Sequence, residues 1–162
     1  KEGYASGHIV HHFKGKKHSN EYKELRSIKQ SKILEEKGNS GFPNIKWFKS
    51  INVEGEEFIL RGTWELKTAE WLTKHGILWK RKIYIKYKSE TINRVYTPDF
   101  YLPEYDIYIE VKGYFSNTDK NKIRLVQQQN SIQINLLFGS GIKKLNEIND
   151  FSDFKKLFTF LS

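Results

Sequence analysis

The sequence contains no cysteine and no methionine, and only three of its 162 residues are proline. Without cysteine, the chain has neither disulfides nor thiolate metal sites of its own, which fits a reducing compartment. It also lacks any apolar run near the roughly 18–20 residues that a membrane helix requires. We therefore expect a protein of the cytoplasm with no membrane partner.

Positive charge, in contrast, is abundant. Lysine and arginine number 28 against 19 acidic residues, which gives a net charge of +9. Seven basic residues and one acid lie between residues 74 and 94, and nine basic residues lie among the first 40. This clustering favours a polyanionic partner, DNA above all, over a basic surface that only keeps the protein soluble. Nothing in the sequence points to a small-molecule substrate. The candidate DNA contacts are Lys14, Lys16, Lys17, Arg26, Lys80, Arg81, Lys82 and Arg94.

The composition divides the chain near residue 41. Residues 1–20 have no sustained hydrophobic period, Ser19 can cap a short polar helix over 20–37, and a glycine-rich linker follows over 38–41. We expect residues 1–41 to be a basic DNA-binding arm, extended and then helical, with its linker. Residues 42–162 should fold as one domain, for which the 15% aromatic content supplies a core.

Strand and helix patterns alternate in that domain. The patterns predict strands over 45–53 and 57–60, β structure over 77–87, and strands over 93–102, 106–112 and 132–138. Helices are expected over 64–75 with Thr63 as cap, from Asn117 or Thr118 to 129, and over 152–161, with a turn at 139–141. This order predicts a mixed α/β fold in which helices flank a sheet.

Charged residues that could take part in catalysis or metal binding lie on two of these strands. Because side chains alternate along a strand, Glu110 and Lys112 share one face of 106–112. On the preceding strand Asp99 follows Pro98, which lacks the N–H that a ladder needs and so marks a start, bulge or edge. A turn at 103–105 makes the two strands antiparallel and brings Asp99 near the other two. The alternative for Glu110 and Lys112 is an ordinary charge pair on a half-exposed strand.

Glu65 adds a third carboxylate, on the core-facing stripe of the helix over 64–75. Burial there is costly unless the carboxylate is paired or bound to a metal, although a first-turn Glu also complements the helix dipole. Oxygen ligands without cysteine favour Mg²⁺ or Mn²⁺. Beside a lysine, such an ion suits hydrolysis of a phosphodiester.

Glu65, Pro98-Asp99 and Glu110-Val111-Lys112 together resemble the signature of the PD-(D/E)XK nuclease superfamily. The segments 96–103 and 110–138 resemble phage junction-resolving endonucleases of the endonuclease I type, so that the resemblance spans about residues 61–140. It implies a restriction-endonuclease-like sheet, with Asp99, Glu110, Glu65 and the carbonyl of Val111 at the metal and Lys112 at the attacking water. It also implies a bacterial or phage-infected host cell, and a homodimer with exchanged elements as one arrangement.

The arm has a resemblance of its own. Residues 13–33 are similar to modular DNA-binding motifs of phage and intron homing endonucleases, although a flexible basic tail is an equal alternative. The main hypothesis is thus a Mg²⁺-dependent DNA endonuclease of the homing type, from a phage or mobile element. The alternatives are a structure-selective Holliday-junction resolvase, the nuclease subunit of a transposase, and a non-catalytic nucleic-acid-binding module.

Overall fold

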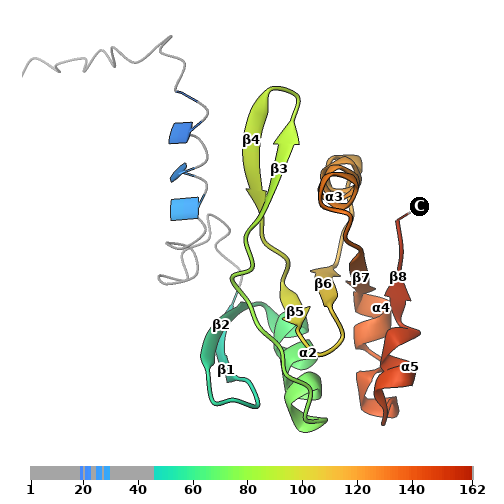
Figure 1. Cartoon of the computed structure of the whole chain (residues 1–162). Coiled ribbons are helices and arrows are strands. Elements are labelled where there is room, and N and C mark those ends of the chain that lie inside the picture. The colour runs from blue at the N-terminus through green and yellow to red at the C-terminus, as the bar shows by residue number, and fades with distance from the viewer. Residues whose placement is uncertain (1–18, 20, 23–24, 27, 30–45, 162) are drawn as a thin grey trace, which may run out of the picture.

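The structure is a computed structural model that describes residues 19, 21–22, 25–26, 28–29 and 46–161 (Figure 1). In the arm, the described residues 21–22, 25–26 and 28–29 are helical, and the N–H of Tyr22 donates to Ser19 Oγ at 3.2 Å. That bond is the one expected of an N-cap serine. The remainder of the predicted arm lies outside the described residues.

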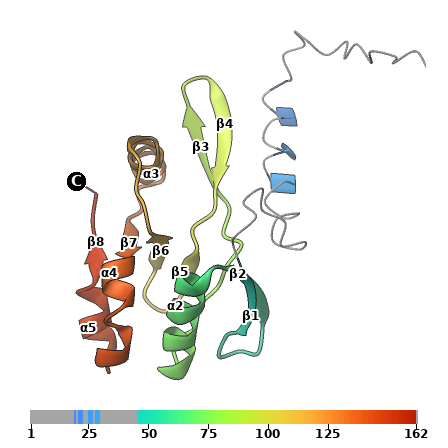
Figure 2. The ribbon, with the colours of Figure 1, turned by 180° about the vertical axis from the view of Figure 1, so that it is seen from behind.

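Two antiparallel hairpins flank the first labelled helix. β1 (Trp47–Ile51) pairs with β2 (Glu57–Arg61), and α2 (Thr63–Lys74) follows. β3 (Ile85–Ser89) then pairs with β4 (Ile92–Tyr96). Figures 1 and 2 show this second hairpin beside α3 (Asn117–Asn130), at the end of the domain opposite the C-terminal end of α2.

The largest sheet of the described residues has the order β5–β6–β7–β8. β5 (Phe100–Leu102) is antiparallel to β6 (Ile107–Lys112), and β6 is parallel to β7 (Ile134–Phe138), with α3 as the crossover. β7 pairs antiparallel with β8 (Phe158–Thr159) after α4 (Gly139–Ile142), a 3₁₀ turn (Leu145–Glu147) and α5 (Phe151–Lys155). The predicted mixed α/β class is confirmed, and none of the described helices is long and apolar enough to cross a bilayer.

Two apolar clusters cover the two faces of this sheet. The odd-numbered residues Ile107, Ile109 and Val111 of β6 pack into the cluster around α2, whereas Tyr108 packs into the cluster around α3. The predicted alternation is therefore observed, and Glu110 and Lys112 lie on the face of the sheet that α3 covers. The members of the α3 cluster are Ile85, Tyr87, Tyr96, Ile123, Val126, Ile134 and Leu136.

Several boundaries differ from the expectation, each for a local reason. Gly62 rather than Thr63 precedes α2 as its cap, in a conformation (φ +89°) that favours glycine. Most of 77–84 is irregular, and its β pairing is limited to an isolated bridge between Lys80 and Tyr101. Pro98 divides the segment 93–102 into two strands, as its missing N–H dictates.

The C-terminal half differs in three places. α3 is capped by Ser116 rather than Asn117 or Thr118, because Ser116 and Asp119 form a reciprocal capping box. The expected turn at 139–141 belongs to the short helix α4, and the expected helix over 152–161 is shorter and gives way to β8. In these segments glycine and aromatic residues follow one another so closely that hydrophobic periodicity does not distinguish a helix from a strand.

Candidate active site

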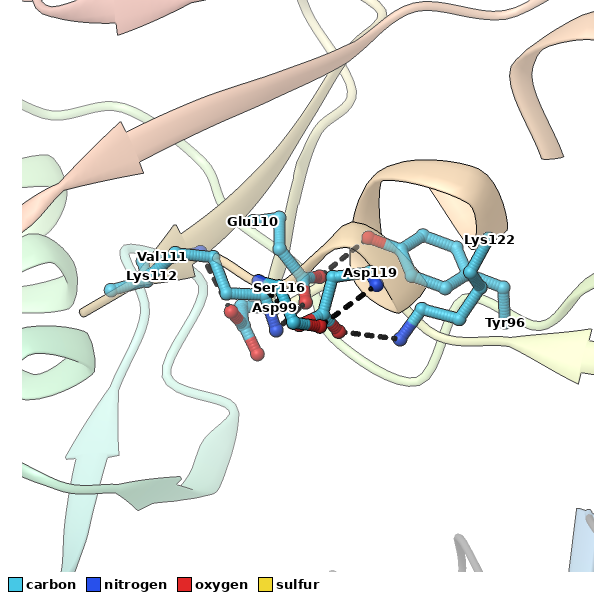
Figure 3. A network of polar contacts seen from close by, with 8 residues as sticks. All are labelled: Tyr96, Asp99, Glu110, Val111, Lys112, Ser116, Asp119 and Lys122. Carbon is cyan, nitrogen blue, oxygen red and sulfur yellow. Dashed lines mark hydrogen bonds and ion pairs between the residues drawn. The ribbon is translucent and has the colours of Figure 1, made fainter. Parts of the chain in front are cut away.

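Asp99 and Glu110 are neighbours across the β5–β6 pair. Phe100 pairs with Ile109 in the antiparallel register. Asp99, which precedes Phe100, therefore lies opposite Glu110, which follows Ile109. Asp99 Oδ2 accepts the N–H of Val111 at 2.7 Å (Figure 3). The structure therefore brings Asp99 to the C-terminal end of β6, where the sequence placed it.

Glu110 is 6% exposed, and both of its carboxylate oxygens have partners. Oε1 lies 2.8 Å from Lys112 Nζ, and Oε2 accepts the hydroxyl of Tyr96 at 2.5 Å (Figure 3). Burial lowers the pKa of Lys112, but the charge of Glu110, its hydrogen bond and the charge of Asp99 outweigh burial and raise that pKa overall. Lys112 is therefore a full positive charge beside the two carboxylates at neutral pH.

The carboxyl of Asp99 has a pKa well above its usual value. Burial is the largest cause, followed by the negative charges of Glu110 and Glu65, while Arg81 and the N–H of Val111 act in the opposite direction. Negative charge concentrated on partly desolvated oxygens is relieved by a proton or by a bound cation. The oxygen donors of Asp99 and Glu110 thus fit a hard divalent ion such as Mg²⁺ or Mn²⁺.

Glu65 lies in the first turn of α2 and is 8% exposed. Its Oε2 accepts the N–H of Arg61 at 3.0 Å and forms an ion pair with Arg81, a residue that the sequence places among the DNA contacts. Among the described residues, no group of three or more His, Asp or Glu side chains stands close enough to hold a metal ion. The three predicted carboxylates are therefore not gathered into one group of ligands: Asp99 and Glu110 are adjacent, and Glu65 is held by arginine.

The other predicted DNA contacts are spread over the molecule. Lys80 lies 3.4 Å from Glu54, and Lys82, Arg94 and Arg26 are exposed. The three arm lysines, Lys14, Lys16 and Lys17, lie outside the described residues. Of the described candidates, Arg81 contacts one of the three carboxylates, that of Glu65.

Sequence reasoning missed Tyr96 and the start of α3. Tyr96 is 4% exposed, and burial, followed by the charge of Glu110, raises its pKa well above the ordinary value, so that its hydroxyl remains a donor. Lys122 lies 5.5 Å from the centre of the Tyr96 ring and 3.6 Å from Asp119. An aromatic residue at the end of an alternating strand is indistinguishable from ordinary core in a sequence; its place three residues before Asp99 was the available signal.

Trp64 fixes the helix that carries Glu65 onto the sheet. Its indole lies over Gly113 and Gly139, the residues that follow β6 and β7: a Cβ on either would come within 2.5 Å and 2.7 Å of the ring. The indole is 37% exposed and so forms part of the surface next to the site. The first turn of α2 is thereby packed against the end of the strand that carries Lys112.

Comparison with known proteins agrees with this geometry. The sequence profile described as Phage endonuclease I matches residues 47–156. The chain belongs to the phage endonuclease I family. This result confirms the predicted resemblance to endonucleases of that type.

Two curated relatives in this family are similar to the chain over 83 residues, which is 50% of its length. It is 35% identical to Endodeoxyribonuclease 1 of Enterobacteria phage T3, over 54% of that protein, and 32% identical to Endonuclease I of Escherichia phage T7, over 55%. The chain thus spans about half the length of these relatives. No solved structure gives a significant match.

Asp99→Asn should stabilise the metal-free protein at neutral pH. A raised pKa means that the folded state holds the Asp99 proton more tightly than the unfolded state, so this contribution to stability is present at low pH and is lost as pH rises through the folded-state pKa. Asparagine stays neutral and keeps an oxygen for the N–H of Val111. In EDTA we expect a higher Tm than that of wild type at pH 7, with the difference vanishing below about pH 4.

Thermal unfolding across this pH range measures the effect. Glu104→Gln, which neutralises an exposed carboxylate in the turn between the same two strands, is the control and should change little. A variant less stable than wild type at pH 7 would contradict the electrostatic interpretation.

Gly113→Ala should lower the free energy of unfolding by about 1–3 kcal/mol, because the added methyl group overlaps the Trp64 ring. Combined with Trp64→Leu, which removes the obstructing ring, the substitution should cost less than it does alone. Urea unfolding of the two single variants and the double variant provides the coupling energy. Strict additivity would show that the indole does not pack on this glycine.

Proposed function

We propose that the chain is a deoxyribonuclease that hydrolyses phosphodiester bonds with Mg²⁺ or Mn²⁺, on a restriction-endonuclease-like scaffold. The observation that carries this proposal is the meeting of Asp99, Glu110 and Lys112 at one end of β5 and β6. Two buried or partly buried carboxylates beside an ammonium form a site for a cation and a phosphate together. The printed names of the two relatives, an endodeoxyribonuclease and an endonuclease, support the same reaction class.

Each residue has a distinct part in the proposed reaction. Asp99 and Glu110 would hold the ion, with Glu65 and the carbonyl of Val111 as further oxygen donors. When bound, the ion polarises a phosphate oxygen and lowers the pKa of water. Lys112 orients the attacking water and offsets the negative charge that develops on the phosphate. Arg81 forms an ion pair with Glu65 and offsets its negative charge within a desolvated turn.

The substrate we favour is branched DNA such as a Holliday junction, cut in a structure-selective way. Family membership supports this alternative better than the homing-type hypothesis, because the match covers residues 47–156 and leaves out the arm on which that hypothesis depends. The presence of both acids and the lysine argues against a non-catalytic module, and nothing in the comparisons favours a transposase subunit. Paired incisions would require a homodimer, since one site cuts one strand. A bacterial or phage-infected cytoplasm is the corresponding location.

Cleavage of supercoiled plasmid and of a four-way junction, each with Mg²⁺ and with EDTA, tests this proposal. Asp99→Ala and Glu110→Gln should abolish cutting while DNA binding persists, and Lys112→Ala should slow it by about 10²–10³-fold. Glu104→Gln should cut like wild type. Preference for the junction supports the resolvase, whereas cutting of linear duplex at a unique site supports the homing enzyme. Ordinary cutting by Asp99→Ala would refute the assignment.

The basic arm is proposed to contact DNA phosphates outside the active site. Replacing Lys14, Lys16 and Lys17 by Gln in the full chain should weaken DNA binding and lower the slope of log K against log salt by about 0.9 for each phosphate that is no longer neutralised. A control triple at exposed positions of the domain, Lys143, Lys144 and Lys155, removes the same charge. Equal changes in the two triples would mean that only net charge matters.

A further inference from the structure

Tyr96 contacts Glu110 of the proposed active site from the α3 side of the sheet. It is the last residue of β4, it is buried in the α3 cluster, and its hydroxyl donates to Glu110 Oε2 at 2.5 Å. Lys112 binds the other oxygen of the same carboxylate. Figure 3 shows the two partners on different sides of Glu110, which therefore cannot rotate without losing one of them.

One short segment reaches β6 in two places. The Tyr96 hydroxyl meets the side chain of Glu110, and three residues later Asp99 Oδ2 meets the N–H of Val111. Only Thr97 and Pro98 lie between, and proline limits the conformations available to this link. The position of the hydroxyl is therefore tied to that of the second carboxylate.

The ring of Tyr96 is itself held by residues of helix α3 and its cap. Lys122 lies over one side of it at 5.5 Å and pairs with Asp119, which in turn accepts the hydroxyl of Ser116 at 2.6 Å. The ring also belongs to the same buried cluster as Ile123 and Val126 of α3. Helix α3 and the β3–β4 hairpin thus determine where the hydroxyl lies, independently of any bound substrate.

We propose that Tyr96 is a positioning residue that orients the Glu110 carboxylate for metal binding and for cleavage. The hydroxyl occupies one lone pair of Oε2 and leaves the other available, since each carboxylate oxygen can accept twice. Partners behind a metal ligand typically change metal affinity or activity by about 10–100-fold when they are removed. The inference rests on the proposed function, but the role in metal binding is measurable without cleavage.

Tyr96→Phe removes one oxygen atom and keeps the buried ring. We expect the Mg²⁺ concentration at the midpoint of metal-induced thermal stabilisation to rise by about 10–100-fold, since Glu110 loses one of the two partners that fix it. On branched DNA, kcat should fall by a similar factor at a fixed Mg²⁺ concentration, with KM for DNA unchanged. Tyr101→Phe is the matched control: its hydroxyl also donates to a carboxylate, that of Asp106 at 3.1 Å, which lies in the turn between β5 and β6, at the other end of β6 from Glu110.

Two results would overturn the proposal. In the first, Tyr96→Phe lowers Tm in EDTA but leaves the Mg²⁺ midpoint and kcat unchanged, so that the hydroxyl only stabilises the fold. In the second, Tyr101→Phe has the same effects as Tyr96→Phe. A wild type that binds Mg²⁺ but cuts no DNA would refute the nuclease proposal alone, because the Mg²⁺ titration would still decide the role of Tyr96.

Lys122→Gln provides a second variant should Tyr96→Phe prove too unstable for titration. It retains the hydroxyl but removes the cation above the ring and the partner of Asp119. We expect a shift of the Mg²⁺ midpoint in the same direction and of smaller size. An unchanged midpoint in this variant would show that the support from α3 does not reach Glu110.

Discussion

The hydrogen bond from the N–H of Val111 to Asp99 is the contact on which the site depends. An N–H of β6 would ordinarily pair with a carbonyl of a neighbouring strand. Because the regular pairing of β5 with β6 begins only at Phe100, two residues after Pro98, the Asp99 side chain accepts that N–H instead. The carboxylate is thereby fixed against β6, next to Glu110, and faces the C-terminal end of the strand that carries Lys112.

The charges around Asp99 determine whether its carboxylate needs a proton or a cation as a partner. Lys112 forms an ion pair with Glu110, and Arg81 forms one with Glu65. Asp99 accepts the N–H of Val111, and its pKa is raised first by burial and then by the negative charges of Glu110 and Glu65. A proton relieves the buried negative charge at low pH, and a bound divalent cation, as proposed for this site, would relieve it at neutral pH. The electrostatic environment of Asp99 therefore supports the metal-dependent reaction proposed for this site.

The sequence predicted the parts of the site that follow from strand periodicity. The alternation of β6, the adjacency of Asp99 and Glu110, and the buried position of Glu65 all follow from local pattern and are observed. The pairing of Glu65 with Arg81 was not predictable, because it joins a helix to an irregular segment whose path depends on tertiary packing. The cap of α3 is a different case, since Ser116 and Asp119 have the spacing of a capping box and local pattern alone suffices to find it.

The site also lies where two separately packed clusters meet. Glu65 is delivered by α2, which Trp64 seats on Gly113 and Gly139, whereas Glu110 is held from the α3 side through Tyr96. A small displacement of either helix would change the separation of Glu65 from Glu110, and the metal binding proposed for these carboxylates tolerates little error in distance. Packing residues outside the proposed site are therefore expected to affect the proposed cleavage. This relation explains why a glycine after β6 and a tyrosine inside the α3 cluster are informative positions for substitution, even though neither would be chosen from its chemistry alone.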